Sequence, residues 1–126
     1  MSHPAIRIGP RMTIADLTRL YGVTPRALRF YEERGLISAR RDRLNQRYYD
    51  ATADRDVELI ARLRKVGLGL PEIRRILEAR RAGEPVRERQ MIASYLAALR
   101  GELDRRLEAI DTAFEEYTSD RRSRVA

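Results

Sequence analysis

The chain has 126 residues and carries 26 lysine and arginine side chains against 19 aspartate and glutamate side chains, a formal net charge of +7. This length accommodates one small domain with an appendage, and a basic excess of this size favours polyanionic partners. Cysteine is absent, which excludes disulfides, thiolate metal sites and cysteine nucleophiles, and no apolar run approaches the roughly 18 residues of a membrane span, so we expect a cytoplasmic protein.

Positive charge is concentrated in the first part of the chain. Residues 1–81 hold 18 basic and 10 acidic side chains, a net charge of +8, whereas residues 82–126 hold 8 basic and 9 acidic side chains, a net charge of −1. We therefore expect the two parts to face different partners.

Residues 1–11 show no hydrophobic periodicity, and we interpret them as a flexible N-terminal arm in which His3, the only histidine, is incidental. A first helix is predicted at about residues 13–21, because apolar side chains recur on one face after Thr13 and an acidic residue follows at capping-box spacing. A glycine-containing turn at residues 22–24 then separates it from a second helix.

The second helix is predicted to begin with Thr24 as its N-cap and Pro25 at its first position, and to end near Gly35. Two helices joined by a short glycine-containing turn are typical of a helix-turn-helix. Arg26 and Arg29 share one face of the second helix, and we expect them to contact bases or phosphates in the major groove.

The apolar side of the second helix is expected to pack on the first, with Leu28 completing a core that includes Leu17 and Leu20. Phe30 and Tyr31 are adjacent, so they cannot both be buried. We expect Phe30 to pack and the Tyr31 hydroxyl to donate to a phosphate oxygen of DNA.

Residues 36–50, LISARRDRLNQRYYD, lack helical periodicity and have apolar or aromatic residues at both ends. They predict a short β-hairpin, or wing. Because side chains alternate along a strand, one of Tyr48 and Tyr49 is expected in the core and the other in solvent. The polar centre of the wing holds a single acidic residue, Asp42, among four arginines, Arg40, Arg41, Arg43 and Arg47.

A third helix is predicted at about residues 52–66 and a fourth from Pro71 to just before the RAGEP segment, after which a long helix runs from about Val86 to Tyr117. The apolar residues of the long helix recur at spacings of 4, 3, 4, 4, 3, 4 and 3, which predicts a dimerising coiled coil with one slip. At a rise of 1.5 Å per residue this helix is about 45 to 50 Å long, so its apolar stripe overhangs the small domain and needs a second chain. The stripe consists of Ile92, Leu96, Leu99, Leu103, Leu107, Ile110, Phe114 and Tyr117.

Three segments, MTIADLTRLYGVTPRALRFYEERGLI, NQRYYD and LIARLRKVGLGLPEIRRIL, together resemble the winged helix-turn-helix of the MerR family of bacterial transcription regulators over about residues 12–80. The resemblance implies a homodimer with an antiparallel coiled coil. It also implies a pseudo-palindromic promoter site, often in an overlong spacer between the polymerase contact elements, which the bound dimer bends and untwists. RNA polymerase at the promoter is then a further implied partner.

The resemblance and the charge of the wing assign DNA contacts to the second helix, the wing and the end of the third helix. Arg47 and Tyr49 match an Arg-x-Tyr strand of the family, and Lys65 matches a cation near the DNA backbone. Arg43 and Asn45 fall at the wing tip, where the family more often has a glycine that is absent here. The complete set is Thr24, Pro25, Arg26, Arg29, Tyr31, Arg41, Arg43, Asn45, Arg47, Tyr49 and Lys65.

The expected architecture is mainly α, a winged helix-turn-helix with a small β-hairpin wing followed by a long C-terminal coiled-coil helix. We expect a flexible arm at residues 1–11, the DNA-binding domain at 12–82, the dimerisation helix at 86–118 and a basic tail at 119–126. Some arginines are as consistent with solvated surface as with DNA contact, namely Arg80, Arg81, Arg121 and Arg122.

The regulatory signal is not evident in the sequence. Members of the family that sense thiophilic metals or redox state use cysteines at the end of the coiled-coil helix, and members that sense drugs carry an extra domain. This chain has no cysteine, and after Tyr117, the last residue of the stripe, the sequence has only Thr118 and SDRRSRVA. We therefore expect neither a metal nor a cofactor.

Several functions can be weighed against one another. An enzyme is disfavoured, because no nucleophile and base can be paired and no glycine-rich phosphate loop is present. We favour a sequence-specific transcriptional regulator that binds and distorts a pseudo-palindromic promoter site as a homodimer. A DNA-architectural or excision accessory protein of the same fold, without a ligand-controlled role in transcription, and a coiled-coil scaffold with a basic half that binds acidic proteins are the alternatives.

Overall fold

The computed structural model describes the backbone of residues 11–125 and the side chains of residues 11–119. His3 with nearly all of the expected arm, and the side chains of Arg121 and Arg122, lie outside the described residues. The predicted fold class, mainly α with a two-stranded wing and a long C-terminal helix, is confirmed. The elements are α1 (Ile14–Tyr21), α2 (Pro25–Glu33), β1 (Arg40–Arg41), β2 (Arg47–Tyr48), α3 (Ala51–Lys65), α4 (Leu70–Arg81) and α5 (Pro85–Val125).

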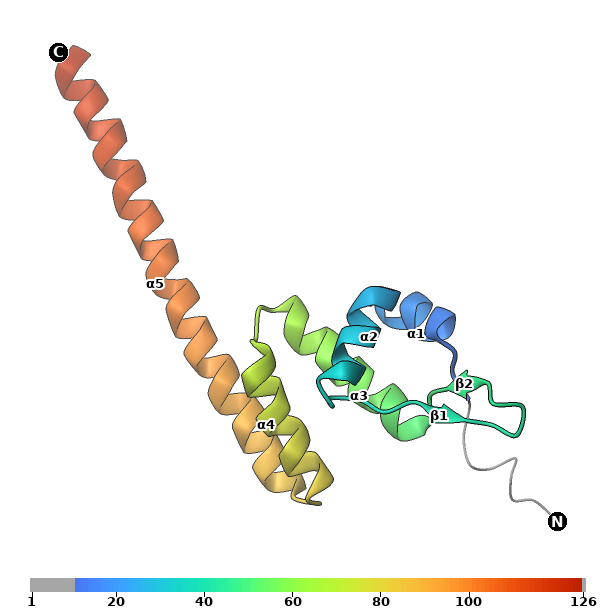
Figure 1. Ribbon diagram of the computed structural model, residues 1–126. Helices are drawn as coiled ribbons and strands as arrows, with labels where there is room; N and C mark the ends of the chain where they lie inside the picture. Colours follow the sequence, from blue (N-terminus) through green and yellow to red (C-terminus); the bar gives the residue numbers. More distant parts are fainter. Residues whose placement is uncertain (1–10, 126) are drawn as a thin grey trace.

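The helices and the wing form one body from which a single helix projects. Figure 1 shows α1 to α4 and the hairpin gathered together, with α5 running alongside α4 and then continuing far beyond it. The 41 residues of α5 correspond to a length of about 60 Å at the usual helical rise. The helix was predicted to end at about Tyr117, but it continues to Val125.

Hydrogen bonds from side chains fix the beginnings of α1 and α2. Thr13 Oγ1 accepts from the Asp16 N–H at 3.1 Å, and a carboxylate oxygen of Asp16 accepts from the Thr13 N–H at 2.9 Å, which is the predicted capping box. Thr24 Oγ1 accepts from the Ala27 N–H at 3.0 Å. These bonds satisfy N–H groups that no helical carbonyl reaches, so both helices of the helix-turn-helix start where the sequence predicts.

The end of α2 is a tight left-handed turn. Gly35 has a φ of 74°, a conformation that costs glycine little because it has no Cβ. The Leu36 N–H donates to the Tyr31 carbonyl at 2.8 Å and the Gly35 N–H donates to the Glu32 carbonyl at 2.9 Å. This is a Schellman motif, and it redirects the chain from α2 toward the wing.

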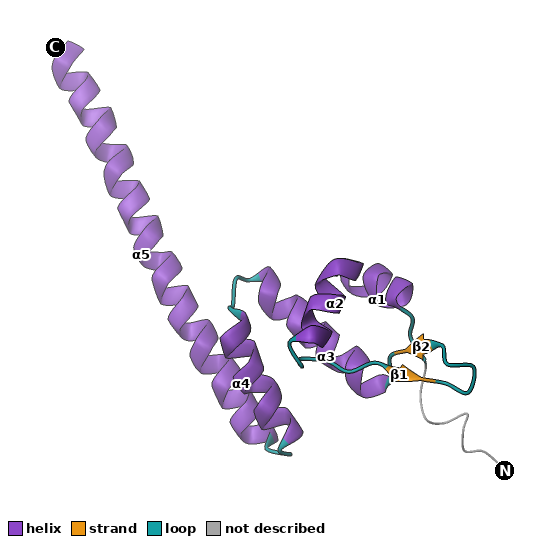
Figure 2. Ribbon diagram, viewed as in Figure 1, coloured by secondary structure: helices purple, strands orange, loops and turns teal. Residues whose placement is uncertain are grey.

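The wing is a short antiparallel hairpin tied to the start of the domain. Arg41 of β1 lies opposite Arg47 of β2. Met12, just before α1, exchanges backbone hydrogen bonds of 2.9 and 2.7 Å with Tyr49, just after β2. Figure 2 shows the hairpin at the end of the domain away from α5, so the wing and the long helix extend in different directions.

Side chains from α1 to α4 and from the base of the wing share one core. Leu20 is not part of it, contrary to the prediction, because its side chain is 52% exposed. The next residue, Tyr21, instead faces α3 and donates its hydroxyl to Asp54 at 2.5 Å. The core side chains that are almost completely buried are Leu17, Leu28, Leu36, Tyr49, Val57, Ile60, Ile73, Ile76 and Leu77.

The first turns of α5 belong to this domain, whereas the rest does not. Ile92, predicted for the dimer seam, is partly buried against the core of its own chain, as are Met91 and Tyr95. Beyond them Leu99 is half-buried, and the exposure of the other stripe residues rises from 37% at Leu96 to 76% at Tyr117. Within residues 11–125, no helix combines the length and the apolar composition that crossing a bilayer requires.

Candidate nucleic-acid interface

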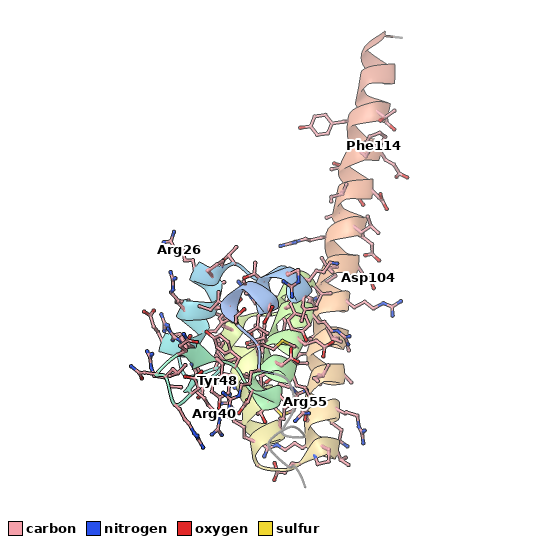
Figure 3. All side chains as sticks on the ribbon, turned by 90° about the vertical axis from the view of Figure 1, so that its right-hand side faces the viewer. Arg26, Arg40, Tyr48, Arg55, Asp104 and Phe114 are labelled. Atoms are coloured by element: carbon pink, nitrogen blue, oxygen red, sulfur yellow. The ribbon has the colours of Figure 1, made fainter. Side chains whose placement is uncertain are left out.

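The N-terminal half of α2 presents two arginines to solvent. Arg26 and Arg29 are exposed, and no ion pair with a described carboxylate holds either guanidinium. In Figure 3, Arg26 projects away from the domain. Thr24 and Pro25 begin the helix beneath them and are exposed as well. The arrangement offers two charged forks on one helix face, as contact with guanine or phosphate requires.

The expected roles of the two aromatic residues of α2 are reversed. Tyr31 is 8% exposed and belongs to the core, whereas Phe30 is 37% exposed, with the Arg34 guanidinium 5.0 Å from the centre of its ring. The reason is helical phase: Tyr31 lies three residues after the buried Leu28 and therefore on the same face, and Phe30 does not. The packing prediction for this pair is wrong, and contact of the Tyr31 hydroxyl with phosphate stays a prediction.

Tyr49 is fully buried, which contradicts a direct contact of its side chain with DNA. Its hydroxyl donates to one carboxylate oxygen of Glu32 at 2.7 Å, and Arg47 forms an ion pair with the other oxygen. Burial and the bond to Glu32 raise the pKa of Tyr49 to about 12. Glu32, which the sequence analysis did not single out, therefore joins α2 to the wing and orients Arg47.

A compact turn forms the wing tip without glycine. One Asp42 carboxylate oxygen accepts from the N–H groups of Leu44 and Gln46, both at 2.9 Å, and Asn45 takes the left-handed conformation, with a φ of 63°. Asn and Asp tolerate this region better than other residues with side chains. Arg43 lies exposed within this turn, so the tip presents a cation on a backbone that the Asp42 hydrogen bonds hold in place.

The other wing arginines are partly engaged. Arg41 donates to the Asn45 carbonyl at 2.9 Å, and Arg40 pairs with Asp50 at 2.8 Å. Tyr48, half-buried, lies under the Arg11 guanidinium, 4.4 Å from the ring centre. Because these contacts leave N–H groups free on Arg41, it keeps the capacity to reach a phosphate oxygen.

Further basic side chains lie at the end of α3 and between the end of α2 and α4. Lys65, the last residue of α3, is exposed. An open hollow of about 440 Å³ separates the end of α2 from the start of α4. Arginines at the end of α2 and on α4 therefore face the same hollow. The hollow is lined by Phe30, Arg34, Leu36, Leu70, Pro71, Arg74, Arg75 and Glu78.

The chemistry that this surface supports is binding. Among the described residues, no group of three or more His, Cys, Asp and Glu side chains is close enough to hold a metal ion. The exposed cationic groups on α2 and at the wing tip are guanidinium donors, which suit phosphate oxygens and the major-groove acceptors of guanine.

Comparison with known proteins matches the helix-turn-helix, the wing and most of α5 to one family of regulators. Residues 12–80 match the MerR HTH family of regulatory proteins, and residues 55–116 match the MerR DNA-binding family. Nodulation protein NolA of Bradyrhizobium diazoefficiens is 39% identical over 69 residues, and the match covers 54% of this chain and 29% of that protein. The HTH-type transcriptional regulator CueR of Escherichia coli is 36% identical over 62 residues, with 48% of this chain and 46% of CueR covered. This chain thus spans less than half the length of either relative.

Solved structures share the fold. A MerR family transcriptional regulator from Listeria monocytogenes superimposes with a TM-score of 0.66 at 24% sequence identity, covering 79% of this chain and 78% of the other. HiNmlR, a MerR family regulator that lacks the sensor domain and was crystallised with promoter DNA, gives a TM-score of 0.61 at 20% identity, covering 87% and 92% of the two chains. At these identities the likeness concerns the arrangement of the helices and the wing.

Proposed function

The chain belongs to the MerR family of transcriptional regulators, and from this premise we propose that it binds a pseudo-palindromic promoter site as a homodimer and distorts the duplex there. The family is one of DNA-binding regulators and not of enzymes. The observation that carries the proposal is the pair of exposed arginines, Arg26 and Arg29, on the second helix of a helix-turn-helix, with a basic wing beside it.

Each part of the DNA-binding surface suits a different contact. Arg26 and Arg29 stand where the second helix of a helix-turn-helix enters the major groove, and the wing with Arg41 and Arg43 would follow the backbone. Lys65 would add a further phosphate contact at the end of α3. Tyr49 has no direct contact in this proposal and acts through Glu32 on Arg47.

The exposed stripe of α5 supports a dimer. Helix stability in proteins comes largely from packing of the apolar face, and the distal part of α5 has no partner among the described residues. Coiled-coil pairing with a second copy would cover this face and hold two recognition helices at a fixed separation. The seam that we propose consists of Leu96, Leu99, Leu103, Leu107, Ile110, Phe114 and Tyr117.

Duplex selection and salt titration test the proposal. In the first step, the protein is used to select binding sites from a pool of random duplexes. The affinity for the selected duplex is then measured between about 50 and 200 mM salt. If the protein contacts several phosphates, binding releases counterions, and added salt lowers the affinity steeply. We expect a two-fold symmetric selected sequence and a steep loss of affinity. An affinity that is independent of salt, or selection of no sequence, would contradict the function.

Transcription separates the proposal from its alternative. With RNA polymerase and a promoter that contains the selected site, a regulator changes the transcript yield and makes the centre of the site hypersensitive to chemical nucleases, since the duplex is bent and untwisted. A DNA-architectural or excision accessory protein of the same fold would bind and bend the site without changing transcript yield.

A further inference from the structure

The carbonyl groups at the end of α2 are held by arginines of α4. Arg74 donates to the carbonyl of Arg34, and Arg81 donates to the carbonyls of Gly35, at 3.3 Å, and Leu36. These three consecutive residues form the turn that follows the recognition helix. Carbonyls at a helix C-terminus carry partial negative charge and attract cations, so α4 fixes the position of this end of α2.

Arg81 also lies close to a buried carboxylate in α3. Asp56 is 3% exposed, and one of its oxygens lies 3.6 Å from Arg81 while the other accepts a hydrogen bond of 3.0 Å from Arg80. A buried carboxylate that lacked these partners would be costly. Asp56 therefore holds two neighbouring arginines of α4 in fixed directions, one toward α2 and one away from it.

The second arginine of this pair reaches α5. Arg80 donates to Glu88 at 2.9 Å, in the first turns of α5, and also to the Arg55 carbonyl at 3.3 Å. The Glu88 side chain is itself largely buried, at 14% exposure. A continuous set of polar contacts thus runs from Glu88 through Arg80, Asp56 and Arg81 to the turn that ends α2; we call it the arginine link.

Ion pairs of this kind contribute little net stability compared with apolar packing, and a role in holding one conformation is the alternative reason for their presence. The arginine link joins the helix proposed to dimerise to the helix proposed to read DNA. A tilt of about 10° about the held end moves the other end of α2, a helix about 13 Å long, by about 2 Å. Such a shift is enough to misplace Arg26 and Arg29 on base edges.

We propose that the arginine link positions the recognition helix relative to α5, so that Arg80 and Arg81 determine which separation of operator half-sites the dimer accepts. This inference rests on the proposed function. It assigns to these two arginines a positioning role, whereas the sequence left them between solvated surface and DNA contact. Without the link, each recognition helix adjusts independently, and the dimer tolerates changes in half-site separation.

A half-site spacing series tests this role. The full-length parent and Arg81→Met are compared on the selected operator and on versions with one base pair added or removed at the centre, a change of about 34° and 3.4 Å in the second half-site. Arg62→Met is the control, because it removes the same charge from an exposed arginine on α3 whose one ion pair among residues 11–119 is with Glu58. For Arg81→Met we expect the affinity ratio between native and altered spacing to fall about tenfold, with Arg62→Met like the parent.

A second variant interrupts the link at its other end. Glu88→Gln weakens the contact with Arg80, and Glu58→Gln is its matched control. If Arg81→Met does not fold, the half-site spacing series with these two variants tests the proposal instead. In Glu88→Gln the amide resonances of Gly35 and Leu36 should also shift and their hydrogens exchange faster, whereas in Glu58→Gln they should not. A purely stabilising role would lower the unfolding temperature and leave the spacing preference unchanged.

The outcomes separate this inference from the function on which it rests. If the parent selects no duplex, the proposed function and the half-site role fall together. If the parent selects an operator but Arg81→Met and Glu88→Gln keep its spacing preference, only the arginine link is refuted.

Discussion

The two parts of the molecule differ in how their apolar side chains are covered. In α1 to α4, side chains such as Ile60, Ile73 and Ile76 are completely buried within one chain. On distal α5, Ile110 is 61% and Phe114 73% exposed, although both regions are helical and follow regular apolar spacing. Regular spacing thus identifies which face of a helix is buried, and the fold decides whether its own chain or another one covers that face.

The same contrast applies to charge. Arg80 and Arg81 of α4 bind carboxylates and carbonyls of their own chain, whereas Arg26 and Arg29 on the recognition helix have no described carboxylate partner. A guanidinium without an internal partner remains available to an external anion. The proposed DNA-binding face and the proposed dimer face are therefore both regions where groups that could bind a partner have none within the described chain.

The largest effect is expected from a charge in the seam. Leu103→Asp places an unpaired carboxylate in the proposed interface, so it should produce monomers that keep the winged domain folded but lose the linked second half-site, lowering operator affinity about 100-fold or more. Sedimentation and binding on the same sample measure both effects. Thr112→Asp adds the same charge on the opposite face of α5 and should remain dimeric; equal effects of the two changes would place the interface elsewhere.

The loss of stability caused by a cavity should depend on protein concentration for distal α5 but not for the winged domain. Ile76→Ala is expected to destabilise the winged domain by about 2 to 5 kcal/mol, independently of protein concentration, because its contacts lie within one chain. Leu107→Ala should instead lower a melting temperature that depends on concentration. Calorimetry at several concentrations checks this, and a concentration-dependent loss for Ile76→Ala would contradict the division.

The two regions proposed to face DNA, the recognition helix and the wing tip, should contribute differently to binding. Arg29→Ala is expected to cost about 1 to 3 kcal/mol at the selected site and to reduce discrimination against random duplex. Arg43→Ala, on the wing tip, should weaken both duplexes about equally and reduce the salt dependence by about one phosphate contact. Competition titrations give both quantities; an equal loss of discrimination in the two variants would mean that the wing reads bases too.

The smallest effect concerns two tyrosines that join elements of the domain. The bond to Asp54 and burial raise the pKa of Tyr21 to about 12, as burial and Glu32 do for Tyr49. Unfolded tyrosine titrates near 10, so above this pH the unfolded chain releases protons first and the free energy of unfolding falls as pH rises toward 12. Denaturant unfolding of the Tyr21→Phe, Tyr49→Phe variant should show a shallower decline in this range than the parent.

The sequence predicted those parts of the fold that depend on local chemistry. The capping box at Thr13, the N-cap at Thr24 and the glycine turn at Gly35 each rest on contacts within a few residues, so their residue types and spacing identify them. The hairpin was predicted for the same reason, from a polar centre between apolar ends.

Tertiary contacts account for what the sequence did not give. Glu32 pairs with Arg47 and Tyr49, which are distant in sequence, and alternation along the strand left Tyr48 and Tyr49 undecided. The burial of Tyr31, by contrast, was available from its spacing to Leu28 and was missed because the hydroxyl suggested a polar role. The turn at Asp42 and Asn45 forms without the glycine that the family more often has, through bonds to the Asp42 carboxylate and a left-handed asparagine.

The stoichiometry of the DNA complex tests the central claim most directly, that each chain supplies half of a DNA-binding unit through the exposed stripe of α5. Sedimentation equilibrium of the full-length protein with a duplex that contains the selected site gives the mass of the complex. The account predicts one duplex with two chains, formed in one step at concentrations where the free protein is already a dimer. A stable complex of one duplex with a single chain, formed although the duplex contains both half-sites, would contradict it.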